Sequence, residues 1–154
     1  MLQKGERMEY CIKDFMGNEF TVRPRLELVS VRNFMGQEMY GLAIALDDIS
    51  GDSVPEQYCC LTVSFGEFIG LKNCAYIDIN NCDFADQLLE QGLAQDTGFT
   101  KHSGMCEYPL WAFDEQTLRE MGQENYEKYD AEYRRYIESF VSDEEEDETF
   151  GMTM

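Results

Sequence analysis

The stretch LELVSVRNFMGQEMYGLAIAL, residues 26–46, decides the fold class. In residues 26–32, successive side chains are expected to point to opposite faces of a strand, and both faces contain apolar residues. Residues 39–46 form a second apolar run of strand length, and Gly36 between the two runs marks a turn. Two strands joined by such a short connection predict an antiparallel pair.

Further strands are expected on both sides of this pair. The segment FTVR (residues 20–23) is predicted to be a short strand, and Pro24 should limit pairing there because proline has no amide hydrogen. Residues 97–104, TGFTKHSG, are predicted to be a loop. The other predicted extended segments are YCCLTVSF (58–65), AYIDI (75–79) and CEYPLWAF (106–113). Successive strands with short connections predict an antiparallel meander.

The hydrophobic period then changes from that of a strand to that of a helix. Apolar residues of CDFADQLLEQG (82–92) fall at helical spacing, with Asn81 as the expected N-cap and Gly92 in the left-handed position after the last turn. Asp114 is predicted to open a second helical region. A longer helix is predicted over residues 124–140.

These elements predict an α+β fold, with an antiparallel sheet of four or five strands and the helices of the C-terminal half packed on one face. At 154 residues the chain is long enough for one domain with a real core. We expect residues 1–141 to form that domain and residues 142–154 to form an acidic tail.

A stripe of aromatic residues runs along the long predicted helix. Its members are spaced by three and four residues, so they share one face: Tyr126, Tyr129, Tyr133, Tyr136 and Phe140. Packing against the sheet is the commoner origin of such a stripe. A partner or ligand surface is the alternative, because each tyrosine has an apolar body and a polar tip. Some of the hydroxyls are therefore expected to reach solvent or a polar partner.

The net charge of −19 is unevenly distributed. Residues 33–100 contain eleven acidic residues and a single basic one, Lys72. Such a surface repels nucleic acid and anionic membranes, and it attracts basic surfaces in a salt-dependent way. Solubility alone is the alternative explanation, although ordinary soluble surfaces intersperse both signs.

Motifs for metal, cofactor or covalent chemistry are weak. His102, Cys106, Cys74 and Cys82 have no zinc-binding spacing, and Cys106 with His102 would need spatial adjacency to act as nucleophile and base. The stretch DDISGDS (47–53) is rich in oxygen ligands. Counted from Asp48, however, the twelfth position, where a calcium loop needs glutamate, is Cys59, so a β-turn is expected. No signal peptide or membrane-length apolar run is present, so we expect a cytoplasmic chain with reduced thiols and no cofactor.

The stretch YIDINNCDFADQLLEQGLAQDTG (76–98), followed by SGMCEYPLWAFD (103–114), resembles a family of small acidic bacterial proteins. That family is catalogued as a domain of unknown function and is often carried on plasmids and conjugative elements. The resemblance covers about residues 58–115 and transfers no catalytic residue. The matching features are Asp78-Ile79-Asn80-Asn81, Gly92-Leu93, Thr97-Gly98, Ser103-Gly104 and Tyr108-Pro109-Leu110.

The resemblance implies a role beside mobile elements, whose proteins often counter host defence. We therefore expect a non-enzymatic inhibitor that mimics DNA and occupies the basic nucleic-acid-binding surface of a restriction enzyme or CRISPR effector, with carboxylates in place of phosphates. The candidate contact residues are Asp47, Asp48, Asp52, Glu56, Glu67, Asp143, Glu144, Glu145, Glu146, Asp147 and Glu148. One alternative is an accessory module of a mobile element that binds its partner through the apolar and tyrosine surface. A small thiol-dependent enzyme is less favoured.

Overall fold

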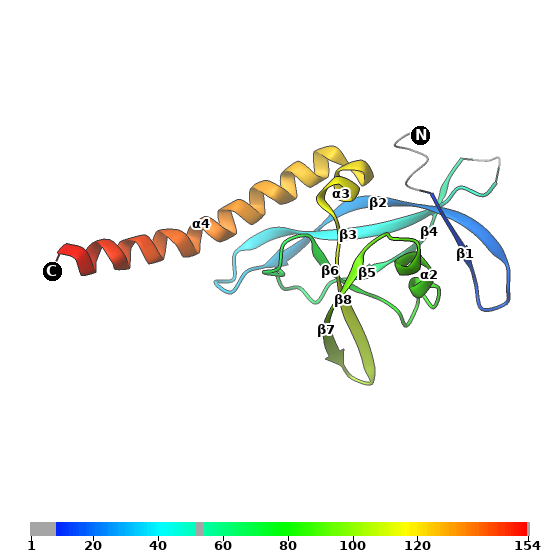
Figure 1. Cartoon of the computed structure of the whole chain (residues 1–154), viewed down its shortest axis with the longest axis horizontal. Coiled ribbons are helices and arrows are strands. Elements are labelled where there is room, and N and C mark those ends of the chain that lie inside the picture. The colour runs from blue at the N-terminus through cyan, green and yellow to red at the C-terminus, as the bar shows by residue number, and fades with distance from the viewer. Residues whose placement is uncertain (1–8, 52–53, 154) are drawn as a thin grey trace.

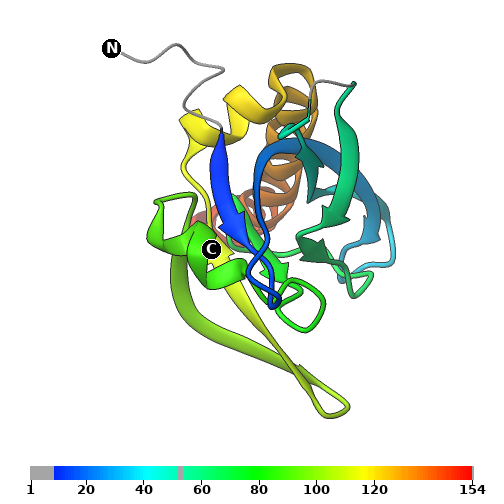
Figure 2. The same ribbon diagram turned by 90° about the vertical axis from the view of Figure 1, so that its right-hand side faces the viewer.

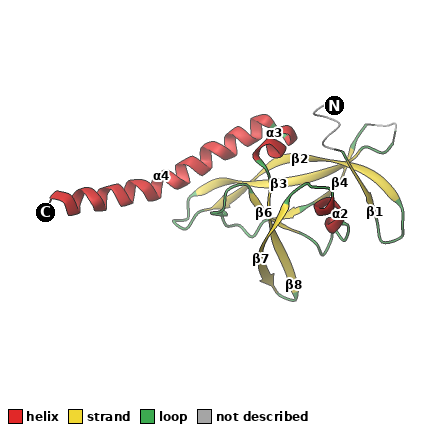
Figure 3. Ribbon diagram, viewed as in Figure 1, coloured by secondary structure: helices red, strands yellow, loops and turns green. Residues whose placement is uncertain are grey.

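The computed structural model describes residues 9–51 and 54–153. Figures 1 and 3 show strands from the first two thirds of the chain and helices mainly from its last third, as in an α+β fold. This confirms the predicted class. The elements are β1 (Tyr10–Lys13), β2 (Glu19–Arg32), β3 (Glu38–Asp48), β4 (Glu56–Cys60), β5 (Thr62–Val63), β6 (Cys74–Ile77), α2 (Ala85–Glu90), β7 (Gln95–Ser103), β8 (Cys106–Ala112), α3 (Glu115–Met121) and α4 (Gln123–Thr153).

The first sheet has the antiparallel order β1-β2-β3-β4. The predicted pair is its centre, because β2 and β3 are in register from Val22 opposite Asp48 to Arg32 opposite Glu38. Pro24 does not interrupt this pairing, contrary to the prediction. The carbonyl of Thr21 accepts a hydrogen bond from Ile49, beyond the end of β3, and backbone groups alternate between the two edges of a strand. The Pro24 nitrogen therefore faces the other edge, where its missing hydrogen costs no β2–β3 bond.

The second sheet has the antiparallel order β5-β6-β8-β7, so the strands form two sheets of four. The segment YCCLTVSF was predicted to be one strand, but it divides at Leu61 into β4 of the first sheet and β5 of the second. Leu61 donates its amide hydrogen to the Ile44 carbonyl of β3, and its own carbonyl accepts from Asp78 next to β6. One residue thus joins the two sheets, and a periodicity argument cannot detect such a change of partner.

Residues 97–104 were predicted to be a loop, and this was wrong. They belong to the hairpin of β7 and β8, which extends away from the rest of the domain in Figures 1 and 2. A β-bulge between Asp96 and Thr100 contains Gly98 at φ +90°, which breaks the alternation expected of a strand. Gly104 with φ +62° opens the two-residue turn that joins the strands.

Helix α2 covers the outer edge of β1. The Gln87 amide accepts from the Lys13 amide at 2.8 Å and donates to the Lys13 carbonyl at 2.9 Å. Gln91, one turn later, bonds both backbone groups of Cys11 in the same way. The predicted cap was wrong, because the Asn81 side chain donates to Asp78 and Phe84 stands at the N-cap without a side-chain bond.

The last two helices lie along β2 and β3. Asp114 accepts from the Gln116 amide and opens α3, as predicted. Helix α4 begins near the predicted position but does not end at Phe140. It continues to Thr153, beyond the tip of the β2–β3 hairpin (Figure 1). None of the helices in the described residues is long and apolar enough to span a membrane.

The core lies where the two sheets and the helices meet. Its largest fully buried side chains include Trp111 of β8, Tyr126 of α4 and Phe84 beside α2. Ile44 of β3 and Ile77 of β6 join the same cluster, so one core connects both sheets. Burial of these side chains holds the two sheets against each other, and the surface groove described below lies between those sheets.

Candidate functional site

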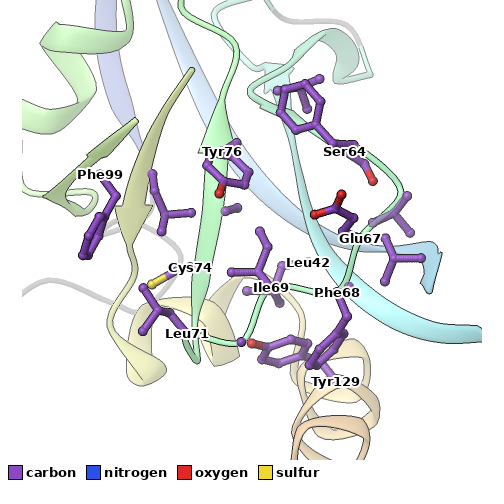
Figure 4. A pocket seen from close by; sticks show the side chains of 18 of the residues that line it. Leu42, Ser64, Glu67, Phe68, Ile69, Leu71, Cys74, Tyr76, Phe99 and Tyr129 are labelled. Carbon is purple, nitrogen blue, oxygen red and sulfur yellow. The ribbon is translucent and has the colours of Figure 1, made fainter. Parts of the chain in front are cut away.

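A half-open groove of about 570 Å³ lies between the two sheets (Figure 4). One side comes from β2 and β3, the other from β6, β7 and β8, and the connection between β5 and β6 borders both. The volume lies within the range of about 300–1,000 Å³ that is usual for binding pockets. The lining includes Val31, Leu42, Phe68, Leu71, Tyr76 and Phe99.

The lining is mainly apolar. Among the described residues that line the groove, Glu67 is the only one with a carboxylate or a basic group. Figure 4 shows the Glu67 side chain directed into the groove among apolar neighbours. Within the described part of the chain its carboxylate has no hydrogen bond or ion pair. Glu67 is exposed, so its negative charge is unpaired and accessible, and a cationic group of a partner could approach it.

Two apolar side chains at the groove remain accessible to a partner. Phe99 of β7 is 63% exposed, and Leu71 of the β5–β6 connection is 47% exposed. A bound partner would cover both side chains and remove their apolar surface from water. Burial of apolar area is the main favourable contribution in most protein associations.

The tyrosine stripe of α4 holds the β5–β6 connection in place. The Tyr133 hydroxyl donates to the Gly70 carbonyl at 2.6 Å, and Phe68 packs against the rings of Tyr133 and Tyr136. The prediction of core packing is confirmed for Tyr126 and Tyr129, which are buried. Later residues of the stripe are progressively exposed, and Phe140 stacks on Phe34 of the β2–β3 turn. The expected polar partners of the hydroxyls are also found.

Asn73 is the junction between this helix and the second sheet. Its backbone has φ +64°, a left-handed conformation that asparagine tolerates better than most residues. Its side-chain oxygen accepts from the Tyr126 hydroxyl at 2.8 Å, and its amide donates to the Tyr129 hydroxyl at 2.9 Å. The Asn73 carbonyl accepts from Phe113 at the end of β8. The β5–β6 connection, α4 and the end of β8 thus meet at Asn73, where the groove segment ends.

Next to Asn73 in the sequence, Lys72 forms an ion pair in which the Asp130 carboxylate is buried and the lysine is exposed. Lys72 Nζ lies 2.7 Å from Asp130 Oδ1, and Arg134 reaches the other carboxylate oxygen at 2.9 Å. The hydrogen bond from Lys72 lowers the pKa of Asp130 below its ordinary value, against the opposing effect of burial. The only basic residue of the span 33–100 is therefore already bound within the protein.

Some predicted acidic contacts are engaged internally. Asp47 receives two hydrogen bonds from the Arg25 guanidinium, at 3.0 Å and 3.2 Å, so its charge is paired across β2 and β3. Asp48 accepts from the Ser50 hydroxyl and from the Ser50 amide, and these bonds lower the pKa of Asp48. The bond from the Ser50 amide to the Asp48 side chain was expected for the oxygen-rich stretch, whereas the rest of the expected β-turn includes residues 52 and 53, which lie outside the description.

The remaining acidic candidates are not gathered at one site. Glu56 is exposed and lies opposite Asp48 across β3 and β4, whereas Glu67 lies in the groove. Asp52 is outside the described residues. The backbone of residues 143–148 continues α4 toward an end of the molecule distant from the β3–β4 turn (Figure 1), and the side chains of these residues lie outside the description.

The proposed thiol pair of His102 and Cys106 is not brought together. His102 is opposite Glu107, and Ser103 is opposite Cys106, in the β7–β8 register. Because neighbouring residues of a strand point to opposite faces, the side chains of His102 and Cys106 lie on different faces of the hairpin. Among the side chains that the structure describes, no three of His, Cys, Asp or Glu form a group that could hold a metal ion.

Sequence reasoning missed the groove. Its lining comes from strands of both sheets and from the segment SFGEFIGLK (64–72), which has neither strand nor helix periodicity. The available signal was the density of Phe, Ile and Leu in a glycine-containing segment, which is unusual for a solvent-exposed connection. A single chain gives no sign that distant strands would converge on this segment.

The family model described as Domain of unknown function (DUF4313) matches residues 30–133. The chain belongs to this family. The DUF4313 region contains the groove lining from Val31 to Tyr129, together with the junction at Asn73. The acidic residues 143–148 lie outside it. Comparison with curated proteins gives no match, and comparison with solved structures gives none either.

Proposed function

We propose that this chain is a non-enzymatic binding protein whose groove receives a segment of a partner protein that combines large apolar side chains with lysine or arginine. The observation that carries the proposal is the single carboxylate of Glu67 in a mainly apolar groove. An apolar surface supplies affinity, and a lone charge selects the sign of the partner's charge.

The surroundings of the groove support a basic partner. Residues 33–100 carry eleven acidic residues, and their one basic residue, Lys72, is held by Asp130. A cationic segment approaching the groove therefore meets a negative potential, which raises its association rate at low salt. Phe99 and Leu71 provide the apolar contact surface once the segment arrives.

The test uses a library of random linear peptides displayed on phage and selected on the intact chain. We expect enriched peptides to combine aromatic or large aliphatic residues with lysine or arginine. Phe99→Ser should weaken their binding by at least about tenfold, or 1.4 kcal/mol, because it removes apolar contact area. Glu67→Gln should weaken the basic peptides but not versions in which glutamine replaces their basic residues.

The matched control is Phe15→Ser, since Phe15 is 85% exposed in the β1–β2 turn and far from the groove lining. This change should leave peptide binding unaltered. Equal affinities for the chain with Phe99→Ser and the chain with Phe15→Ser would reject the groove as the binding surface. Enriched peptides without basic residues would reject the role of Glu67.

A second candidate is the acidic decoy that mimics DNA on a host-defence enzyme. Two points favour it. The single basic residue of the span 33–100, Lys72, is paired with Asp130, and the family resemblance implies carriage on mobile elements. Its contact residues would be Glu56, Glu67 and residues 143–148, because Asp47 and Asp48 are engaged internally.

The full chain and a variant with residues 143–148 changed to Asn and Gln distinguish the two candidates. Both are used to capture proteins from host lysate at low and high salt, with and without competing DNA. A decoy should retain a nucleic-acid-binding enzyme that salt and DNA displace, and the neutralised variant should lose it. Capture that competing DNA does not displace and that is lost on Phe99→Ser would instead favour the groove.

A further inference from the structure

Two cysteines from distant parts of the chain meet beside the point where the chain passes from one sheet to the other. Cys59 lies near the end of β4, and Cys82 lies in the turn that precedes α2. Their sulfur atoms are 3.6 Å apart. The Cys82 thiol is also 3.5 Å from the Cys60 carbonyl oxygen, so it is held against the end of the strand.

The environments of the two thiols differ. Cys82 is completely buried, whereas Cys59 is only partly buried and can be reached from solvent. The hydrogen bond from Cys82 lowers the pKa of Cys59, and the same bond together with burial raises the pKa of Cys82. The nearby Asp78 carboxylate opposes ionisation of both thiols. Cys59 is therefore the thiol that ionises first, and Cys82 remains a protonated neighbour.

We propose that Cys59 and Cys82 form a reversible dithiol–disulfide pair that is oxidised by a low-molecular-weight disulfide such as glutathione disulfide. The Cys59 thiolate attacks one sulfur of that disulfide, which forms a mixed disulfide and releases one glutathione thiolate. Cys82 then loses its proton and attacks the Cys59 sulfur, which expels the second glutathione. The protein loses two protons and two electrons, and the small disulfide takes them up and is reduced to two thiols.

The geometry favours this pair over other pairings of the six cysteines. A disulfide bond is about 2.0 Å long, so the Cys59 and Cys82 sulfurs must approach by about 1.5 Å. The neighbouring Cys60 points elsewhere, since its sulfur lies 3.6 Å from the Ile44 carbonyl oxygen and 3.3 Å from that of Thr62. Successive side chains of a strand face opposite sides, which separates Cys60 from the pair.

The bond would join the ends of the segment that forms much of the groove. Residues between Cys59 and Cys82 include Ser64, Glu67 and Leu71 of the lining. Closing a covalent loop reduces the conformational freedom of the segment inside it. The redox state of the pair thus limits how far this side of the groove can move. The proposal itself stands on the thiol geometry and does not depend on what the groove binds.

The test incubates the folded, reduced chain with excess glutathione disulfide, then denatures it and alkylates the free thiols. We expect two of the six cysteines to escape alkylation, and before alkylation the intact mass should fall by two hydrogen atoms on formation of the disulfide. Tryptic cleavage at Lys72 separates the cysteines, because peptide 33–72 contains Cys59 and Cys60 and peptide 73–101 contains Cys74 and Cys82. The two peptides should therefore be found joined.

Variants identify the partners within each peptide. Cys60→Ser and Cys74→Ser should still give the joined peptides, whereas Cys59→Ser should abolish them. Cys82→Ala should stop the reaction at the mixed disulfide on Cys59. The joined peptides in the wild-type chain do not depend on whether the variants fold. Alkylation of all six cysteines after prolonged oxidation, or a bond that survives Cys59→Ser, would overturn the proposal.

Discussion

The hydroxyl of Tyr126 tests whether the junction at Asn73 stabilises the fold as described. Tyr126→Phe keeps the fully buried ring and removes only the hydroxyl that donates to Asn73 Oδ1 at 2.8 Å. A neutral hydrogen bond contributes about 0.5–1.5 kcal/mol net, and an acceptor left without a partner costs about 1–3 kcal/mol. Asn73 is only half-buried, so water can partly replace the lost donor. We expect a loss of about 1.5 kcal/mol.

Urea unfolding measures this loss, with fluorescence of the single tryptophan, Trp111, as the probe. Trp111 is 1% exposed in the second sheet and should report global unfolding. The expected loss corresponds to a fall of about 3–6 °C in Tm for a chain of this size. Tyr136→Phe is the matched control, because Tyr136 is half-buried on the same helix face and its hydroxyl has no hydrogen bond in the described residues. It should change the stability by less than about 0.5 kcal/mol.

A double-mutant cycle decides whether the bond to Asn73 causes the loss. In an Asn73→Gly background the acceptor is gone, so Tyr126→Phe should cost about 1 kcal/mol less than in the wild-type chain. Glycine also accepts the φ of +64° without strain, which keeps the backbone conformation accessible. An equal cost of Tyr126→Phe in both backgrounds would refute the assignment of stability to this bond.

Two further predictions concern the ion pair and the covered strand edge. A lowered pKa at Asp130 contributes stability that is present above the unfolded value of about 3.9 and is lost as pH falls through the lower folded value. Asp130→Asn, which breaks the bond to Lys72, should therefore cost about 1.5–3 kcal/mol at neutral pH, and urea unfolding should show this difference shrinking below about pH 4. Gln87→Ala should speed hydrogen exchange of the Lys13 amide, which loses its acceptor, whereas Glu90→Ala on the exposed side of α2 should not. An unchanged exchange rate at Lys13 would contradict the bond.

Local patterns were sufficient for much of the fold. Alternation over residues 26–32 predicted the second half of β2, the Asp114 cap predicted the start of α3, and Gly92 has the left-handed φ of +87° expected after α2. Each of these features depends on residues close together in the sequence. The division at Leu61 depends instead on two partners, Ile44 and Asp78, that only the folded chain brings together.

The candidate site was harder to predict for the same reason. Net charge by segment was visible in the sequence, but the pairing of Asp47 with Arg25 joins residues of two different strands. The bulge at Gly98 interrupts the alternation by which β7 could have been predicted, and β7 supplies Phe99 to the groove. Charge counts thus gave an expectation for the sign of the partner's charge, whereas the position of the apolar surface could be found only in the tertiary structure.

The glutamine contacts of α2 also have a consequence for the order in which the protein is made. Gln91 is 80 residues from the Cys11 backbone that it covers. During synthesis the β1–β2 hairpin leaves the ribosome well before α2 does. The outer backbone groups of β1 therefore lack their glutamine partners until α2 has been made. An open strand edge is a template for pairing with another chain, and slow translation between β2 and α2 lengthens that exposure. Aggregation during expression should therefore depend on how fast α2 follows, even though the finished protein has this edge covered.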